Sequence, residues 1–222
     1  MGKFKTIDQA QIEGRRVLVR ADLNVPMDGD KVTDTTRIDR LKPTIDWLVK
    51  NVPETNGNVG ITGSSYVGFT ALVATINPHP ALKASVPQSP MVDGWMGDDW
   101  FHNGAFRTFG FDFALGQMVE KGGGSVPMGT GDEYVSYLKA GSSAGYARMW
   151  GIENLPVVRK MMEHPAYDQY WQEQAVDKLL AKRKLTVPTL VMLGQWDQED
   201  SYGAPHVFQA VKAAQPNAPI ML

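Results

Sequence analysis

The stretch NVGITGSSYVGFT, residues 58–70, holds two serines between glycines. The apolar residues before the serines predict a strand, and those after them predict a helix. A serine in a glycine-flanked turn of this kind is typical of a nucleophile elbow, G-x-S-x-G, which raises the hydroxyl above the edge of a sheet. Here the spacing from Gly63 to Gly68 is one residue longer than in that motif. Two interpretations stay open: Ser65 attacks an acyl group, or the segment is an ordinary turn with exposed serines.

The elements that would position such a serine alternate along the chain. Strands are expected near residues 16–22, 58–62, 83–87, 187–193 and 219–222. Helices are expected from Thr35, capped by Asp34, over 69–76, and over 204–214, and Pro43 should kink or divide the first of them. This alternation predicts an α/β fold with a parallel sheet and helices on both of its faces.

The sequence also indicates a division into parts. Residues 91–183 are rich in aromatic side chains and mostly helical in pattern, which predicts a helical cap inserted into the sheet domain. The core would then comprise residues 44–90 and 184–222, and residues 1–43 would add a β-α segment that completes the sheet.

Composition limits the classes of function. The 222 residues carry a formal net charge of −2, so no general attraction to nucleic acid or to an anionic membrane is expected. Cysteine is absent, which excludes disulfides and cysteine metal sites, and we expect neither a metal nor a cofactor. The N-terminal residues lack the apolar core of a signal peptide, and no apolar run reaches the length of a membrane span, so a cytoplasmic location is expected.

Several longer motifs resemble those of one enzyme family. The segments GSSYVGFT, NPHPALKASVPQSPMVDGWMGDDWFHNGAFR, HPAYDQYWQ and VPTLVMLGQWDQED closely resemble the α-amino acid ester hydrolases. These are relatives of the cocaine esterase and X-prolyl dipeptidyl aminopeptidase group of serine hydrolases. The resemblance covers about 44–222. It implies an incomplete α/β-hydrolase sheet with a helical cap. It also implies hydrolysis or transfer of acyl groups that bear an α-amino group, including β-lactam side chains.

The resemblance assigns roles to particular residues. The nucleophile falls on Ser65, one oxyanion donor on the backbone N–H of Tyr66, and the triad aspartate on Asp197. The carboxylates that bind the substrate's α-ammonium group fall on Asp99, Glu199 and Asp200. Several carboxylates around one pocket favour a cation. Without the resemblance, these three carboxylates would be interpreted as solvated loop charges.

Two further requirements of the family's chemistry are not met by the sequence given. The triad in this fold runs Ser, Asp, His, and the histidine that follows Asp197 is His206, within a predicted helix. In the family the histidine lies beyond the next strand. The family also uses a tyrosine hydroxyl from before the nucleophile, whereas the first tyrosine here is Tyr66. We therefore expect an impaired hydrolase.

The first 43 residues resemble a different family. The segment GRRVLVRADLNVPMDGDKVTDTTRI closely resembles the start of phosphoglycerate kinase, and its phosphoglycerate ligands would fall on Asp22, Asn24 and Arg37. The nucleotide-binding half of that kinase has no counterpart here. The chain is thus interpreted as a chimera, joined near residues 41–45. Two alternatives to the hydrolase stay open: a phosphoglycerate kinase fragment and an inactive chimeric scaffold.

Overall fold

The structure is a computed structural model that describes residues 9, 11–12, 19, 27–28, 31–32, 36–97, 100–107, 110–111, 113, 115, 132–197 and 199–222. For residues 27–28, 31–32, 36–41 and 133 it describes the backbone alone. Most of the strand predicted at 16–22 lies outside the described residues, as do Asp22, Asn24 and Asp99.

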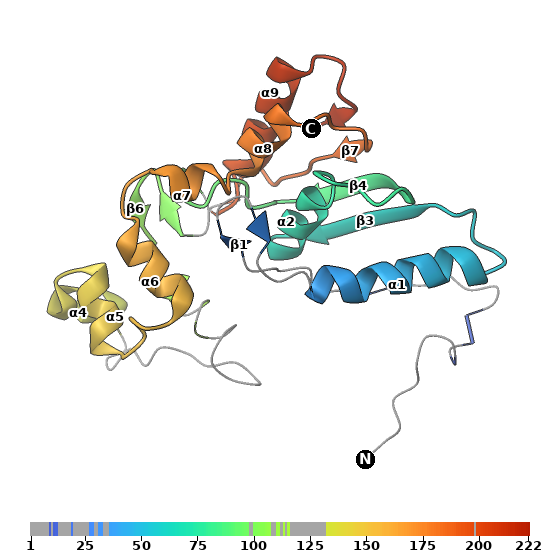
Figure 1. Ribbon diagram of the computed structural model, residues 1–222. Helices are drawn as coiled ribbons and strands as arrows, with labels where there is room; N and C mark the ends of the chain where they lie inside the picture. The colour runs from blue at the N-terminus through green and yellow to red at the C-terminus, as the bar shows by residue number, and fades with distance from the viewer. Residues whose placement is uncertain are drawn as a thin grey trace.

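A four-stranded parallel sheet forms the centre of the described fold (Figure 1). Its strand order is β3-β4-β7-β8. The bounds are Val59–Ser64 for β3, Leu82–Gln88 for β4, Thr189–Leu190 for β7 and Ile220–Met221 for β8. The four strands predicted at these places are confirmed, although β7 and β8 are shorter than the runs 187–193 and 219–222.

Three helices pack against one face of this sheet. They are α2 (Tyr66–Val73), α8 (Val176–Lys182) and α9 (Gly203–Ala214). Leu72 of α2, Leu180 of α8 and Val207 of α9 are completely buried in one apolar cluster, which also contains Val191 and Ile220 from the sheet. This cluster is the core of the molecule, and it lies directly behind the strand ends that carry the candidate site.

The helices that connect the four described strands, α2, α8 and α9, all lie on one face of the sheet, whereas the sequence predicted helices on both faces. The strands follow one another across the sheet in chain order, and parallel connections are right-handed. Each connecting helix therefore arrives on the same face. The opposite face stays largely open along β3, where Gly60, Thr62 and Ser64 are exposed.

The helix α1 (Thr36–Asn51) precedes the sheet and lies below β3 in the view of Figure 1. Pro43 was predicted to kink or divide this helix; it lies within α1, so the predicted division is wrong. The Pro43 ring is exposed. Asp46 of α1 contacts His79 in the turn before β4, with 3.0 Å between Oδ1 and Nε2, and this contact joins the helix to the sheet.

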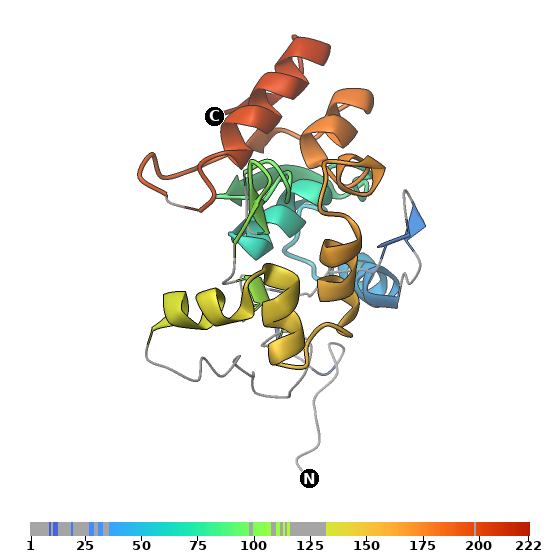
Figure 2. The same ribbon diagram turned by 90° about the vertical axis from the view of Figure 1, so that its left-hand side faces the viewer.

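The remaining elements are short, and they lie near the N-terminus and between β4 and β7. Two two-stranded hairpins are described, β1 (Met27–Asp28) with β2 (Lys31–Val32) near the N-terminus and β5 (Phe101–His102) with β6 (Ala105–Phe106) after β4. The helices are α4 (Glu133–Ala140), α5 (Ser143–Met149), α6 (Pro156–Glu163) and α7 (Gln169–Gln172). Figure 2 shows α4, α5 and α6 on the opposite side of the sheet strands from α9.

Two aromatic clusters hold this segment together. Phe111, Tyr146 and Val158 are buried in one of them, and Phe101, Met161 and Trp171 in the other. Helix α8, which falls inside the predicted cap 91–183, instead packs with the sheet core. We therefore propose that the cap is limited to the elements from β5 to α7 and that α8 belongs with the core.

Candidate active site

Ser65 occupies a strained turn between β3 and α2. Its φ is 57° and its ψ is −125°, a left-handed conformation that residues other than glycine rarely adopt. The side chain is exposed, and the backbone N–H of Ser65 donates to the Gln88 carbonyl of β4 at 2.9 Å. The turn thus presents the hydroxyl at the carboxyl end of the sheet, where an elbow places its nucleophile.

Two glycines make this turn sterically feasible. A Cβ on Gly68 would lie 2.3 Å from the Gln88 carbonyl oxygen, and one on Gly63 would lie 2.5 Å from Val67. Helix α2 therefore approaches β3 and β4 more closely than any side chain at these positions would allow. The longer spacing from Gly63 to Gly68 keeps both close approaches.

Asp197 lies in the loop after β7, at the same end of the sheet. Its Oδ1 accepts hydrogen bonds from the backbone N–H groups of Asp200 and Glu199, each at 3.0 Å. Its Oδ2 accepts a hydrogen bond from the Ser89 hydroxyl at 3.0 Å. These backbone N–H groups hold the pKa of the Asp197 carboxyl below its ordinary value, and the Ser89 hydroxyl and the positive charge of Arg107 act in the same direction.

The sheet register brings the two loops together. Ser64, the last residue of β3, pairs with Gln88 of β4, and Gln88 pairs with Met192 after β7. Ser65 and Ser89 therefore leave neighbouring strands at one edge, and Ser89 contacts Asp197. The structure thus places the predicted nucleophile and the predicted acid on either side of the end of β4.

His206 does not contact Asp197. It lies in the first turns of α9, where its Nδ1 is 2.7 Å from the Tyr202 carbonyl oxygen and its ring stacks on Tyr202 with 3.6 Å between ring centroids. This position is away from both oxygens of Asp197, whose hydrogen bonds come from Ser89 and the backbone.

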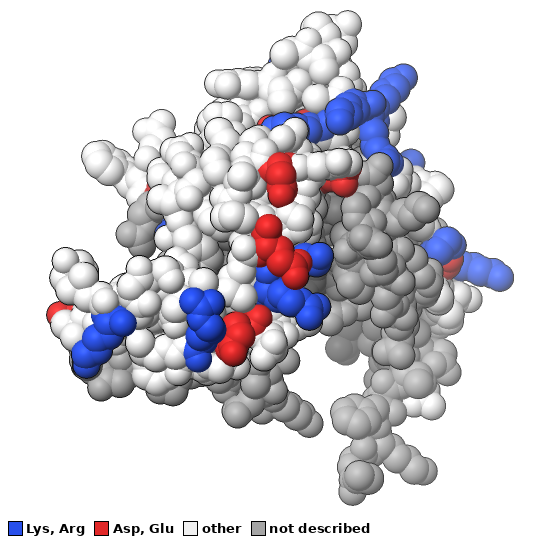
Figure 3. All heavy atoms as spheres, turned by 60° about the vertical axis from the view of Figure 1, so that its left-hand side comes forward, with Lys and Arg blue, Asp and Glu red and all other residues white. Residues whose placement is uncertain are grey.

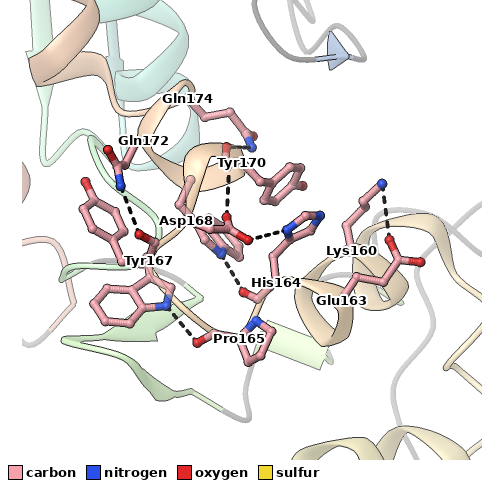
Figure 4. Close-up of polar contacts among 11 residues, drawn as sticks. Lys160, Glu163, His164, Pro165, Tyr167, Asp168, Tyr170, Gln172 and Gln174 are labelled. Carbon is pink, nitrogen blue, oxygen red and sulfur yellow. Dashed lines mark hydrogen bonds and ion pairs between the residues drawn. The ribbon is translucent and has the colours of Figure 1, made fainter.

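Two of the other three histidines are paired elsewhere. In Figure 4 the His164 ring points to Asp168, with 2.6 Å between Nδ1 and Oδ2, and it stacks on Tyr170. Asp168 also caps α7 by accepting from the Tyr170 N–H. His79 contacts Asp46, and His102 is exposed in β5. No described histidine forms a hydrogen bond with Ser65 or with Asp197.

Of the three predicted substrate carboxylates, two are described. Asp200 is buried, and its Oδ1 has no hydrogen-bond partner among the described residues. Burial, followed by the negative charges of Glu199 and Asp197, raises the pKa of Asp200 to about 6, and the positive charge of Arg107 opposes this change. Glu199 is half-buried beside it. Because a cation would compensate the mutual repulsion of these carboxylates, the loop is suited to an ammonium group.

Aromatic rings extend from the elbow toward the segment after β4. Tyr66 begins α2, and its ring centroid is 6.3 Å from those of both Phe69 and Phe113. Phe113 in turn contacts Trp100 edge-on at 6.0 Å. The N-terminus of α2 carries a partial positive charge, which suits a developing oxyanion at Ser65.

Two residues of this site were not predicted from the sequence. Ser89 follows a predicted strand, so its place at the carboxyl edge could have been inferred, but its contact with Asp197 could not. Arg107 stands near the acidic loop with no local sequence signal. Among the described residues, no group of three or more His, Cys, Asp or Glu side chains could hold a metal ion.

The fold and the strained serine turn define an incomplete α/β hydrolase. The profile of the X-Pro dipeptidyl-peptidase (S15) family matches residues 27–222, and the chain belongs to this family. This family match supports the hydrolase function that the motifs led us to expect.

Solved structures give the same assignment. A selenomethionine-labelled α-amino acid ester hydrolase is 52% identical, with a TM-score of 0.73 over 78% of this chain and 28% of that one. An aminopeptidase from a marine sediment Thaumarchaeota archaeon is 48% identical, with a TM-score of 0.75 over 83% of this chain and 30% of that one. The chain therefore spans less than a third of the length of these two proteins.

A second similarity concerns a short part of the chain. The phosphoglycerate kinase of Rhodopseudomonas palustris is 62% identical over 45 residues, which are 20% of this chain and 11% of the kinase. That of Jannaschia sp. is 42% identical over 88 residues, 39% of this chain and 22% of the kinase. Together with the family match, these similarities support the interpretation of the chain as a chimera.

Proposed function

We propose that the chain is a serine hydrolase of the α-amino acid ester hydrolase type. Ser65 would attack the carbonyl of a small substrate, and the N–H of Tyr66 would bind the oxyanion. Glu199 and Asp200, together with Asp99 outside the described residues, would bind the substrate's α-ammonium group. The observation that carries the proposal is the φ of 57° at Ser65, in the turn after β3, which β4 alone separates from β7, the strand that leads to Asp197.

Attack by Ser65 requires a base in addition to the elbow. A serine hydroxyl is a poor nucleophile near neutral pH unless a base takes its proton. Asp197 is suited to orient and stabilise an imidazolium, and it is itself too weak a base to replace one. His206 is turned toward Tyr202, so the described residues include an elbow and an acid but no histidine bonded to either of them.

The size of the expected defect follows from these losses. Removal of a triad base costs on the order of 10⁶ in turnover. Absence of an oxyanion donor costs a further factor of about 10²–10³. We therefore propose that the 222 residues bind α-amino esters weakly and hydrolyse them hardly above background.

Hydrolysis of phenylglycine methyl ester tests the proposal. Three proteins are compared: the chain, its Ser65→Ala variant, and the chain extended with the segment of the α-amino acid ester hydrolases that bears the histidine. We expect Ser65-dependent hydrolysis from the extended chain alone. An extended chain that binds the ester but never hydrolyses it faster than Ser65→Ala contradicts the assignment of Ser65.

The similarity to phosphoglycerate kinases supports a second candidate, a kinase fragment. A kinase needs a nucleotide site, and the matched part is about one tenth to one fifth of the kinases' length. We expect no ADP-dependent turnover of 1,3-bisphosphoglycerate. Turnover that is present in the chain and lost in Arg37→Ala would favour the kinase instead.

A further inference from the structure

Ser89 has a backbone conformation that its residue type does not explain. Its φ is 40°, and among the described residues only Ser65 and Asn103 share a positive φ without being glycine. Glycine adopts this region with least strain, so a serine here needs another justification. Strained residues of this kind gather at functional sites, which makes the contacts of Ser89 informative.

Those contacts reach both halves of the candidate site. The Ser89 hydroxyl donates to Oδ2 of Asp197 at 3.0 Å, and its backbone N–H donates to the Met192 carbonyl at 2.7 Å. The carbonyl of the preceding residue, Gln88, accepts the N–H of Ser65 at 2.9 Å. A segment of two residues therefore holds the turn of the predicted nucleophile on one side and the predicted acid on the other.

The hydroxyl also completes the restraint on the carboxylate. The N–H groups of Glu199 and Asp200 bind Oδ1 alone, so they do not by themselves hold Oδ2. Ser89 is the one described side chain that donates to Oδ2. In a triad the carboxylate must present one oxygen to an imidazole in a fixed orientation. A glycine at position 89 would suit the backbone but would leave this oxygen unheld.

We propose that Ser89 is a positioning residue that orients the Asp197 carboxylate and joins it to the backbone of the Ser65 turn. Its meaning for catalysis rests on the proposed hydrolase function, whereas the orientation of Asp197 is a property of this chain by itself. The two claims can therefore fail separately.

The test is an NMR titration of the Asp197 side-chain carboxyl carbon in the full chain and three variants. Ser89→Ala and Ser89→Gly remove the hydroxyl, and Ser89→Gly also removes the backbone strain, so it folds even if Ser89→Ala does not. Ser201→Ala is the matched control, because Ser201 is an exposed serine close to Asp197 in the same loop.

We expect the pKa of Asp197 to rise in both Ser89 variants, because a hydrogen bond to the charged form is lost, and to stay unchanged in Ser201→Ala. An unchanged titration in Ser89→Gly, or an equal rise in Ser201→Ala, overturns the proposal. If Ser65 proves unable to attack esters even in the extended chain while the titration moves as expected, the hydrolase assignment fails and the role of Ser89 remains.

Discussion

At the scale of residues, the candidate site is held mainly by backbone groups. Ser65 is placed by its own strained φ and by the Gln88 carbonyl, and Asp197 is placed by two N–H groups and one hydroxyl. Charged side chains then set the electrostatics of the loop after β7. Two neighbouring aspartates there differ in the direction of their pKa changes, and this difference is open to measurement.

The free energy of unfolding of Asp200→Asn should increase relative to that of the wild type as the pH rises. The folded-state pKa of Asp200 is raised from 3.8 to about 6, so its proton is bound more tightly in the folded chain. Its contribution to stability is present below pH 4 and is lost as the pH rises through 6. We expect the difference in free energy of unfolding between variant and wild type to grow by about 2 kcal/mol between pH 4 and 8.

Asp197→Asn provides the matched control, with the opposite sign. The pKa of Asp197 is lowered, so its contribution is present above the ordinary pKa of an aspartate and is lost as the pH falls. This variant should lose stability relative to wild type as the pH rises. Urea unfolding followed at several pH values measures both, and parallel pH profiles for the two variants would contradict the account.

At the scale of elements, the site depends on the close approach of α2 to β3 and β4. The pattern of apolar residues predicted the strand and the helix around Ser65, because their periodicity is local. It could not predict the φ of Ser89 or the place of Arg107, because both depend on strands that are distant in sequence. The rule that proline interrupts a helix predicted a kink or a division at Pro43, and α1 continues through it undivided.

Gly68→Ala should disrupt the elbow. The added Cβ would lie 2.3 Å from the Gln88 carbonyl, which is backbone and cannot move aside, so α2 must shift. We expect a loss of about 1–3 kcal/mol in the free energy of unfolding. Gly60→Ala is the control, because its nearest contact would be 3.9 Å away. Equal losses in the two variants, measured by urea unfolding, would show that helix packing at Gly68 is not special.

At the scale of the whole molecule, the sheet is only partly covered. The sequence predicted the strands and their parallel arrangement, but it could not assign the side of each helix, since that follows from strand order and crossover handedness together. The two outer strands of the described sheet are β3 and β8.

Charged side chains of both signs are interspersed on the face shown in Figure 3. No helix of the described chain is long and apolar enough to cross a membrane.

The open sheet should make the polypeptide prone to self-association. Met221 in β8 is 61% exposed, and Met192 after β7 is 45% exposed. Outer strands with exposed apolar residues pair readily with other chains. We expect Met221→Lys to remain monomeric at higher concentrations than wild type in light scattering. Met149→Lys on helix α5, where Met149 is 44% exposed, should not help. A reversible, concentration-independent monomeric melt of the wild type would contradict this.

Labelling with a fluorophosphonate probe tests most directly the claim that Ser65 lies at an elbow but lacks a base. The probe reacts with serines that a positioned base activates. Peptide mapping should find Ser65 labelled in the chain extended with the family's histidine segment, and neither in the 222-residue chain nor in Ser65→Ala. Rapid labelling of Ser65 in the 222-residue chain would contradict the account and would make His206 the first residue to replace.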